Sequence, residues 1–348
     1  MPGAAARCVF ACFKRVERWG DAITGFAGPW FIGLAVCLFT GGTICFLDVI
    51  LPSLPWPVLT VPPCLLIITN LYAHYYYVCT VSPGFVDEPP IQLDGHNSLL
   101  WAKRRADGSR HGGVSWSDEL GLNITPASIG MCRKCNHPRP ERGRTTVVVS
   151  IHPTGRDCRY CLQYPLAYPQ APGINQCVGI NNERHFVLFM AYLVIATASY
   201  VLTGIPHVYD AFGLNDPFKD TWNHNVPAVY FAVTYVLCFV MCFAVSVMLA
   251  WHIYAIAQAE TAVEAHDHDA YRAMARERGD VFVNSYDLGW KRNLQLFFNL
   301  GPGRYSIYAL LLPLRVPPYT DGRAWARRAG LERHSGIRVG EELTDEED

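Results

Sequence analysis

Four long apolar stretches dominate the pattern of hydrophobic and polar positions along the chain. They run from Trp30 to Leu51, Leu54 to Val78, Phe186 to Ile205 and Val226 to about Ala257. Each one approaches or exceeds the roughly 20 residues that a helix needs to cross a bilayer. The pattern therefore predicts an all-α polytopic membrane protein with four transmembrane helices, of which the first two form a hairpin.

A few positions inside these stretches are unusual for a membrane span. Pro62 and Pro63 lie in the second stretch, and we expect them to kink its helix or delay its start, because proline donates no backbone hydrogen bond. His74 and His252 lie near the ends of the second and fourth stretches. They could serve a proton relay, although helix packing is the simpler interpretation.

Positive charge is distributed unequally among the loops. The loop between the second and third stretches is rich in Lys and Arg, whereas Lys219 is the only basic residue between the third and fourth. Because Lys and Arg accumulate on the cytosolic side of short loops, both termini and the long loop are expected in the cytosol. The expected organisation is a cytosolic N-terminus (1–29), a transmembrane hairpin (30–78), a cytosolic linker (79–131), a Cys-rich module (132–185), two further spans with a short lumenal loop (186–257) and a cytosolic C-terminal region (258–348).

Composition supports a membrane protein and excludes some functions. Hydrophobic residues make up 51% of the chain and charged residues 17%, with a mean hydropathy of +0.11. Soluble domains carry about a quarter charged residues. The net charge of −1 offers no bulk basicity for nucleic acid, so the bilayer is the expected partner.

Five of the 13 cysteines fall in the long cytosolic loop. Two Cys-x2-Cys pairs separated by about twenty residues can close a tetrahedral zinc site, and a histidine can complete a mixed one. Numerous prolines in this loop disfavour long helices, so a metal would have to order it. The candidate ligands of structural zinc are Cys132, Cys135, Cys158, Cys161, Cys177 and His152.

Three segments outside the spans carry weaker signals. The polar stretch Gly84 to Ser128 is expected to be a loosely ordered linker. Residues Ala259 to Met274 have the pattern of an amphipathic helix. Leu294 to Leu312 is apolar enough to pack on the membrane surface or against the spans.

The motifs around the cysteines resemble those of the DHHC family of protein S-acyltransferases, also called palmitoyltransferases. Cys132–Arg142 resembles the start of the family's Cys-rich domain, and Ile174–Phe186 resembles its end. Thr80–Gly84 is similar to its Asp-Pro-Gly motif, Thr261–Glu264 to its Thr-Thr-x-Glu motif, and Asn284–Asn293 to its Asn-x-Tyr-Asp-x-Gly motif. The order of these motifs along the chain also matches the family.

The resemblance implies an activity, a co-substrate and a location. A cysteine thiolate would take a fatty acyl group from palmitoyl-CoA or another long-chain acyl-CoA and pass it to cysteines of membrane-associated protein substrates. Zinc would have a structural role. The protein would be a multi-pass protein of the endoplasmic reticulum or Golgi membrane.

The sequence departs from the family where the nucleophile should lie. Tyr168-Pro-Gln-Ala171 occupies the positions of the Asp-His-His-Cys tetrapeptide, so Ala171 replaces the expected cysteine and no catalytic residue is predicted. An alanine cannot form a thioester. Residues 145–173 depart from the family pattern, whereas the segments on both sides resemble the family motifs.

Several interpretations of this departure stay open. The chain could be a catalytically inactive membrane scaffold of the DHHC type, or Cys158 or Cys161 could act as a displaced nucleophile. A third hypothesis is that residues 145–173 translate a retained intron or a shifted reading frame. A transporter is disfavoured because Asp48 is the only acidic residue within the four stretches and lies near an end.

Overall fold

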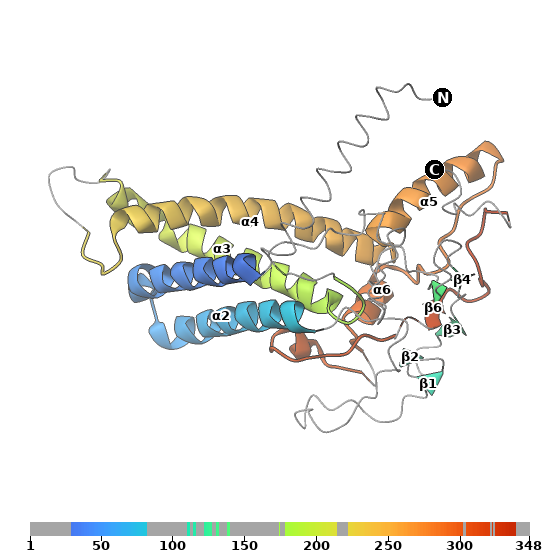
Figure 1. Ribbon diagram of the computed structural model, residues 1–348, viewed down its shortest axis with the longest axis horizontal. Coiled ribbons are helices and arrows are strands. Elements are labelled where there is room, and N and C mark those ends of the chain that lie inside the picture. The colour runs from blue at the N-terminus through green and yellow to red at the C-terminus, as the bar shows by residue number, and fades with distance from the viewer. Residues whose placement is uncertain are drawn as a thin grey trace. The chain divides into compact units, whose positions relative to one another are not determined.

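A computed structural model gives the arrangement of the chain (Figure 1). It describes residues 29–81, 110–111, 114–115, 122–126, 130–131, 138–139, 174, 178–213, 222–301, 304–320, 322 and 324–338. The chain divides into two compact units. The first comprises Met1–Pro55, Tyr168–Cys177 and Tyr200–Leu237, and the second comprises Trp56–Ala167, Val178–Ser199 and Cys238–Asp348.

Four helices in the described residues are long and apolar enough to cross a membrane. They are Pro29–Ser53, α2 (Pro57–Thr80), α3 (Glu183–Ala211) and α4 (Ala228–Ala257). This confirms that the four apolar stretches form helices long enough to cross a membrane. Both α3 and α4 contribute residues to each of the two units.

Prolines change the ends of the first two spans. The first span passes into a π-helical segment η1 (Phe46–Ile50) and a 3-10 turn η2 (Leu51–Ser53), which contains a proline. Trp56 precedes α2 with a left-handed φ of 56°. The helix α2 begins before Pro62 and Pro63, so these prolines do not delay its start as one of our expectations had it.

The first unit packs largely through aromatic rings. Phe231 of α4 is fully buried and lies 5.7 Å from the ring of Tyr200 and 5.4 Å from that of Trp222, measured between ring centroids. Asp48 accepts hydrogen bonds from the Val226 N–H (2.9 Å) and the Asn225 side chain (2.7 Å). These bonds fix the chain just before α4 begins.

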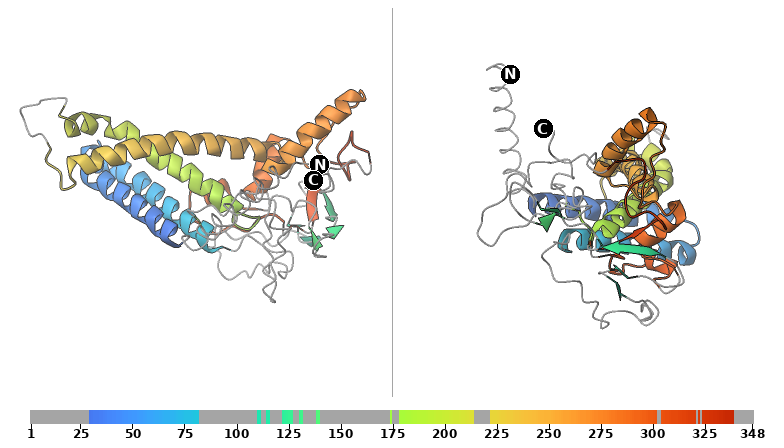
Figure 2. Two further views of the ribbon diagram at one scale, coloured as in Figure 1. Left: turned by 45° about the horizontal axis from the view of Figure 1, so that its top comes forward. Right: turned by 90° about the vertical axis from the view of Figure 1, so that its right-hand side faces the viewer.

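The second unit adds short helices to the spans. These are α5 (Ala262–Glu277), α6 (Trp290–Phe297) and the 3-10 turn η4 (Ile307–Leu310). Figure 2 shows α5 leaving the end of α4 at an angle. The expected amphipathic helix is confirmed as α5, displaced by three residues because its cap is at Thr261.

Short antiparallel strands correct the all-α prediction and the expectation of a loosely ordered linker. The strand β3 (Asn123–Pro126) lies in the expected linker and pairs with β6 (Ala324–Arg327), all four residues of which are buried. Ile124 and Thr125 are β-branched and favour a strand. Two smaller ladders pair β1 (Arg110–His111) with β2 (Val114–Ser115) and β4 (Gly130–Met131) with β5 (Pro138–Arg139).

Candidate active site

The residues that the sequence proposed for chemistry and metal binding lie outside the described part of the chain. They are Cys132, Cys135, Cys158, Cys161, Cys177, His152 and the nucleophile position Ala171. Among the residues that the structure does describe, no group of three or more His, Cys, Asp or Glu side chains could hold a metal ion. The described residues instead show how the surrounding motifs are held, and all of those discussed below belong to the second unit.

Asn182 joins the end of the Cys-rich segment to the end of α2. Its side-chain oxygen accepts the Gly179 N–H at 2.7 Å, which closes the turn that leads into α3. Its side-chain amide donates to the Val81 carbonyl at 3.3 Å. Asn182 is fully buried. Two motifs that lie far apart in the sequence, at Thr80–Gly84 and Ile174–Phe186, are therefore in contact through one side chain.

Arg184 is the second residue of α3 and is 3% exposed. Its guanidinium donates to the carbonyls of Ala309 (3.0 Å) and Leu314 (3.4 Å). Burying a guanidinium without a carboxylate partner is costly, and carbonyl acceptors offset that cost only in part. The arrangement ties the start of α3 to a C-terminal segment.

His74 of α2 and His185 of α3 form a buried pair. Their Nδ1 atoms are 3.1 Å apart, so one nitrogen carries the shared proton and the other accepts it. The His74 ring stacks on Tyr192, with centroids 5.8 Å apart, and the His185 ring contacts Tyr77 at 4.8 Å. The sequence offered a relay or a packing role for His74 and did not reveal its partner. His252 packs edge-on against the Phe186 ring at 5.5 Å.

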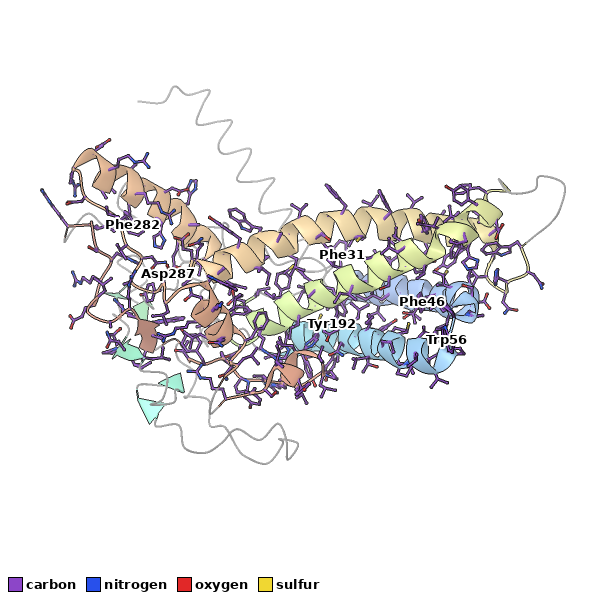
Figure 3. The ribbon with its side chains drawn as sticks, turned by 180° about the vertical axis from the view of Figure 1, so that it is seen from behind. Phe31, Phe46, Trp56, Tyr192, Phe282 and Asp287 are labelled. Carbon is purple, nitrogen blue, oxygen red and sulfur yellow. The ribbon has the colours of Figure 1, made fainter. Side chains whose placement is uncertain are left out.

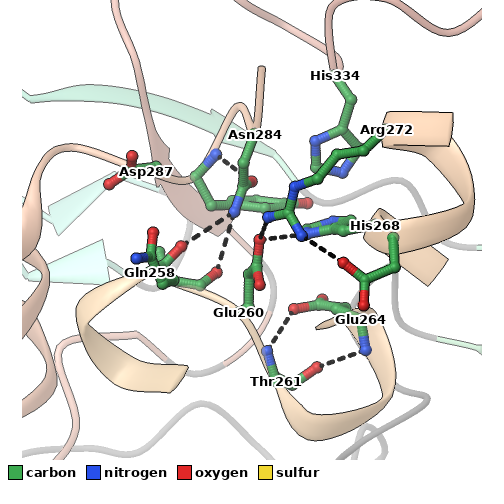
Figure 4. Close-up of polar contacts among 12 residues, drawn as sticks. Gln258, Glu260, Thr261, Glu264, His268, Arg272, Asn284, Asp287 and His334 are labelled. Carbon is green, nitrogen blue, oxygen red and sulfur yellow. Dashed lines mark hydrogen bonds and ion pairs between the residues drawn. The ribbon is translucent and has the colours of Figure 1, made fainter. Parts of the chain in front are cut away.

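The motif after α4 forms the N-terminal cap of α5. The Thr261 hydroxyl accepts the Glu264 N–H at 3.3 Å, and the Glu264 carboxylate accepts the Thr261 N–H at 3.0 Å (Figure 4). This reciprocal capping box satisfies two N–H groups that a helix end leaves free. The spacing of Thr and Glu in the motif therefore has a structural explanation.

Glu260 lies at the centre of an ion cluster beside this cap (Figure 4). One of its oxygens accepts from His268 Nδ1 (2.9 Å) and from the Arg272 guanidinium (2.6 Å). Arg272 also pairs with Asp269 at 2.8 Å. Partial burial acts to lower the pKa of Arg272, but the carboxylates of Glu260 and Asp269 outweigh it and raise that pKa above its ordinary value.

Asn284 and Asn293 attach the C-terminal motif to the end of α4. Asn284 donates to the carbonyls of Gln258 (3.2 Å) and Ala259 (3.5 Å), and its side-chain oxygen accepts the Tyr286 N–H at 3.0 Å. Asn293 donates to the Ala257 carbonyl and to Asp287, both at 2.8 Å. Asn293 therefore satisfies a carbonyl group of the last turn of α4, and Asn284 satisfies those of the two residues that follow the helix.

Comparison with known proteins connects these motifs to a family. Residues 156–269 match the family model described as "DHHC palmitoyltransferase". "Palmitoyltransferase ZDHHC16" of Mus musculus is 24% identical over 96% of this chain and 83% of that protein, and the Homo sapiens protein of the same name is 23% identical over 96% and 84%. "Probable protein S-acyltransferase 16" of Arabidopsis thaliana is 28% identical over 50% of this chain and 55% of that protein.

The class that the fold and the matched region define is a polytopic membrane protein with a DHHC domain. Over residues 156–269 the chain resembles the DHHC palmitoyltransferase family, and over almost its whole length it is similar to proteins named palmitoyltransferases. The motifs that carried the resemblance in the sequence are the same ones whose contacts hold the end of α2, the start of α3 and the end of α4. The family assignment therefore agrees with the local structure at each described motif.

Proposed function

We propose that the chain is a protein S-palmitoyltransferase that uses a long-chain acyl-CoA. The match of residues 156–269 to the palmitoyltransferase family model is the observation that carries this proposal. It spans the end of the Cys-rich module, both following spans and the start of α5. Membrane-associated proteins with cytosolic cysteines are the proposed substrates.

The reaction consists of two acyl transfers. A cysteine thiolate of the enzyme attacks the thioester carbonyl of acyl-CoA, so that a new C–S bond forms and coenzyme A leaves as a thiolate that takes up a proton. A substrate cysteine then attacks the acyl-enzyme in the same way and releases the enzyme thiol. A neighbouring histidine takes the thiol proton in each attack.

The described side chains serve as positioning residues in this proposal. Asn182 and Arg184 hold the end of the Cys-rich module against Val81 and the C-terminal segment. A nucleophile must be fixed near the membrane surface to meet both an acyl chain and a substrate cysteine. The contacts of α3 with α2 would hold the module at that level.

We also propose structural zinc in the Cys-rich module, from the spacing of Cys132, Cys135, Cys158 and Cys161, with Cys177 and His152 as further candidates. When bound, zinc would cross-link a segment that has few apolar residues of its own to bury. Metal analysis of the purified chain should detect zinc, and Cys132→Ser should lower the zinc content. Equal zinc content in the two proteins would contradict this assignment.

The proposed membrane is that of the endoplasmic reticulum or Golgi, with both termini and residues 79–185 in the cytosol. The sequon Asn123-Ile124-Thr125 then faces the cytosol and stays free of glycan. Digestion with an endoglycosidase should leave the mobility of the protein unchanged. A shift to higher mobility would reverse the proposed orientation.

Two measurements, made one after the other, test the activity. The transcript between Arg144 and Ile174 is sequenced first, because a cysteine six residues before Cys177 would identify the nucleophile. The encoded full chain is then incubated with alkyne-labelled palmitoyl-CoA, and a hydroxylamine-sensitive label is expected on the protein. Matched Cys→Ser variants of that cysteine, or of Cys158 and Cys161 if the stretch is unchanged, assign the labelled thiol.

The inactive scaffold is the alternative outcome of the same experiment. It is favoured if the transcript encodes Ala171 as written and the chain takes no hydroxylamine-sensitive label. In that case no enzyme thioester forms, and palmitoyl transfer by this chain is excluded. A label that is lost only in the Cys158→Ser or Cys161→Ser variant would instead identify a displaced nucleophile.

A further inference from the structure

Residues 305–314 form an uncharged segment between two arginines, Arg304 and Arg315. The segment has little regular structure of its own, with one 3-10 turn at Ile307–Leu310. It lies beside α2, where it is drawn in orange-brown below that helix in Figure 1. It lies in the C-terminal region that we expected in the cytosol, and most of it belongs to Leu294–Leu312, which we expected to pack on the membrane surface or against the spans. Its contacts with α2 and α3 agree with packing against the spans.

The carbonyl groups of this segment are satisfied by side chains of two spans. Leu311 accepts from the Asn70 amide (2.9 Å), Leu310 from the Tyr192 hydroxyl (2.8 Å) and Pro313 from the Tyr77 hydroxyl (3.2 Å). Arg184 serves Ala309 and Leu314, as described above. Five consecutive or nearly consecutive carbonyls thus have donors from α2 and α3.

The donors differ in depth along the spans. Asn70 lies ten residues before the end of α2, and Tyr192 lies nine residues after the start of α3. At a rise of 1.5 Å per residue, both lie about 13 to 15 Å along the helix axis from those helix ends. Tyr77 and Arg184 lie within one turn of those helix ends. The donors to Leu310 and Leu311 are therefore the deep ones, and the donors to the flanking carbonyls are the shallow ones. Figure 3 shows Tyr192 on α3 where that helix lies beside α2.

Apart from Ser306, the exposed side chains of this segment are aliphatic or aromatic. Ile307 is 66% exposed, Tyr308 63% and Leu311 50%. On α2, Leu65 and Tyr76 are similarly exposed. The segment is bonded to α2 through Asn70 and Tyr77, so its exposed apolar side chains lie near a helix whose own apolar surface would be covered by acyl chains in a membrane.

We infer that residues 304–315 form a re-entrant segment that enters the hydrocarbon layer, with its tip at Leu310 and Leu311 and with Ile307 and Tyr308 in contact with lipid acyl chains. Non-helical backbone is tolerated at such depth only where protein groups satisfy its hydrogen bonds, and the five side-chain contacts meet that condition. Arg315, which is exposed, follows the segment where headgroups favour a long basic side chain, whereas Arg304 at its other end is buried in the protein. The inference is independent of the proposed activity.

A depth measurement tests the inference on the full chain. A fluorescent amino acid is introduced at Tyr308 by stop-codon suppression, and the protein is reconstituted in phosphatidylcholine vesicles. Lipids brominated on the acyl chains should quench the probe several-fold more strongly than aqueous iodide does. The matched control carries the probe at Val281, which is 77% exposed and lies in a C-terminal loop, where iodide should be the stronger quencher.

A second experiment asks whether the side-chain donors hold the segment at its depth, with a matched control variant. The probe is moved to Leu311, and the donors are removed by the double substitution Asn70→Leu and Tyr192→Phe. Iodide quenching at Leu311 should rise in the double variant, whereas Tyr76→Phe, on an exposed face of α2, should leave it unchanged. Iodide quenching at Tyr308 and Leu311 that equals quenching at Val281 in the otherwise unchanged chain would overturn the inference, whatever the acylation assay shows.

Discussion

Two groups of polar side chains in the second unit differ in the kind of hydrogen-bond acceptor that their basic residues use. The first group lies where the end of α2 meets the start of α3. Here the His74 and His185 rings are hydrogen-bonded to each other, and Arg184 donates to backbone carbonyls. Carboxylates take no part in these contacts. In the second, after α4, Glu260 binds both His268 and Arg272. Among the described residues, the first group is therefore held without a carboxylate partner, while the second contains one.

This difference follows the surroundings of each group. Arg184 is 3% exposed and lies at the start of α3, a helix long and apolar enough to cross a membrane, whereas the Arg272 side chain is 45% exposed. A carboxylate would be costly to desolvate inside a membrane, so neutral carbonyl and imidazole acceptors are the better partners there. Close to water, an ion pair loses less solvation, although its net contribution is small.

Replacement of the buried arginine should have the largest effect. Arg184→Leu removes the donor to Ala309 and Leu314 and leaves their carbonyls without a partner, which should lower the free energy of unfolding by about 3 kcal/mol. Unfolding by SDS titration in mixed micelles measures it. The matched variant Arg272→Leu should cost at most about 1 kcal/mol, since that ion pair is partly exposed. Equal losses in the two variants would remove the distinction between the groups.

The histidine pair should show strong coupling. His74→Leu leaves His185 Nδ1 buried without its partner and should destabilise the protein by about 2 kcal/mol. The double variant His74→Leu with His185→Leu should lose less than the sum of the two single variants, because no buried nitrogen is left unpaired. The same SDS titration provides the complete cycle, and additive losses would argue against a shared proton.

Asn284→Ala tests the polar connection after α4. The substitution removes the donor to Gln258 and Ala259 and the acceptor for the Tyr286 N–H, and a loss of about 1 to 2 kcal/mol is expected. Native-state hydrogen exchange should show that the substitution accelerates amide exchange in α6 more than in α2, each compared with the unchanged protein. Uniform acceleration through both helices would show that the connection is not local.

The smallest expected effect is a gain in stability at Ala259. This alanine has a left-handed φ of 52° at the end of α4, where the Glu260 N–H donates to the Ala255 carbonyl at 3.0 Å. Glycine adopts this conformation without the steric penalty, so Ala259→Gly should stabilise the protein by about 0.5 to 1 kcal/mol. Thermal melting in detergent measures the change. Ala257→Gly, within the helix, is the control and should destabilise by a similar amount.

Local sequence patterns predicted most of what short-range physics controls. The four spans follow from apolar stretches of sufficient length, and α5 follows from its amphipathic pattern and from the Thr261–Glu264 cap. The pairing of β3 with β6 was not predicted, because the strands are four residues long and about two hundred residues apart. For the proposed chemistry, the sequence supplied the family motifs and the unexpected Ala171, while the candidate ligands lie outside the described residues.

The sequence by itself determined the four apolar helices and the resemblance to the DHHC family, because each depends on residues that are close together in the chain. Only the tertiary structure decided that His74 meets His185, 111 positions away, and that Asn70 donates to Leu311, 241 positions away. Such pairs cannot be recognised from the local sequence. A buried donor needs an acceptor of suitable geometry in space, and that acceptor can lie at any distance along the chain. The apolar pattern of Leu294–Leu312 indicated packing on the membrane surface or against the spans, but not which side chains of α2 and α3 donate to its carbonyl groups.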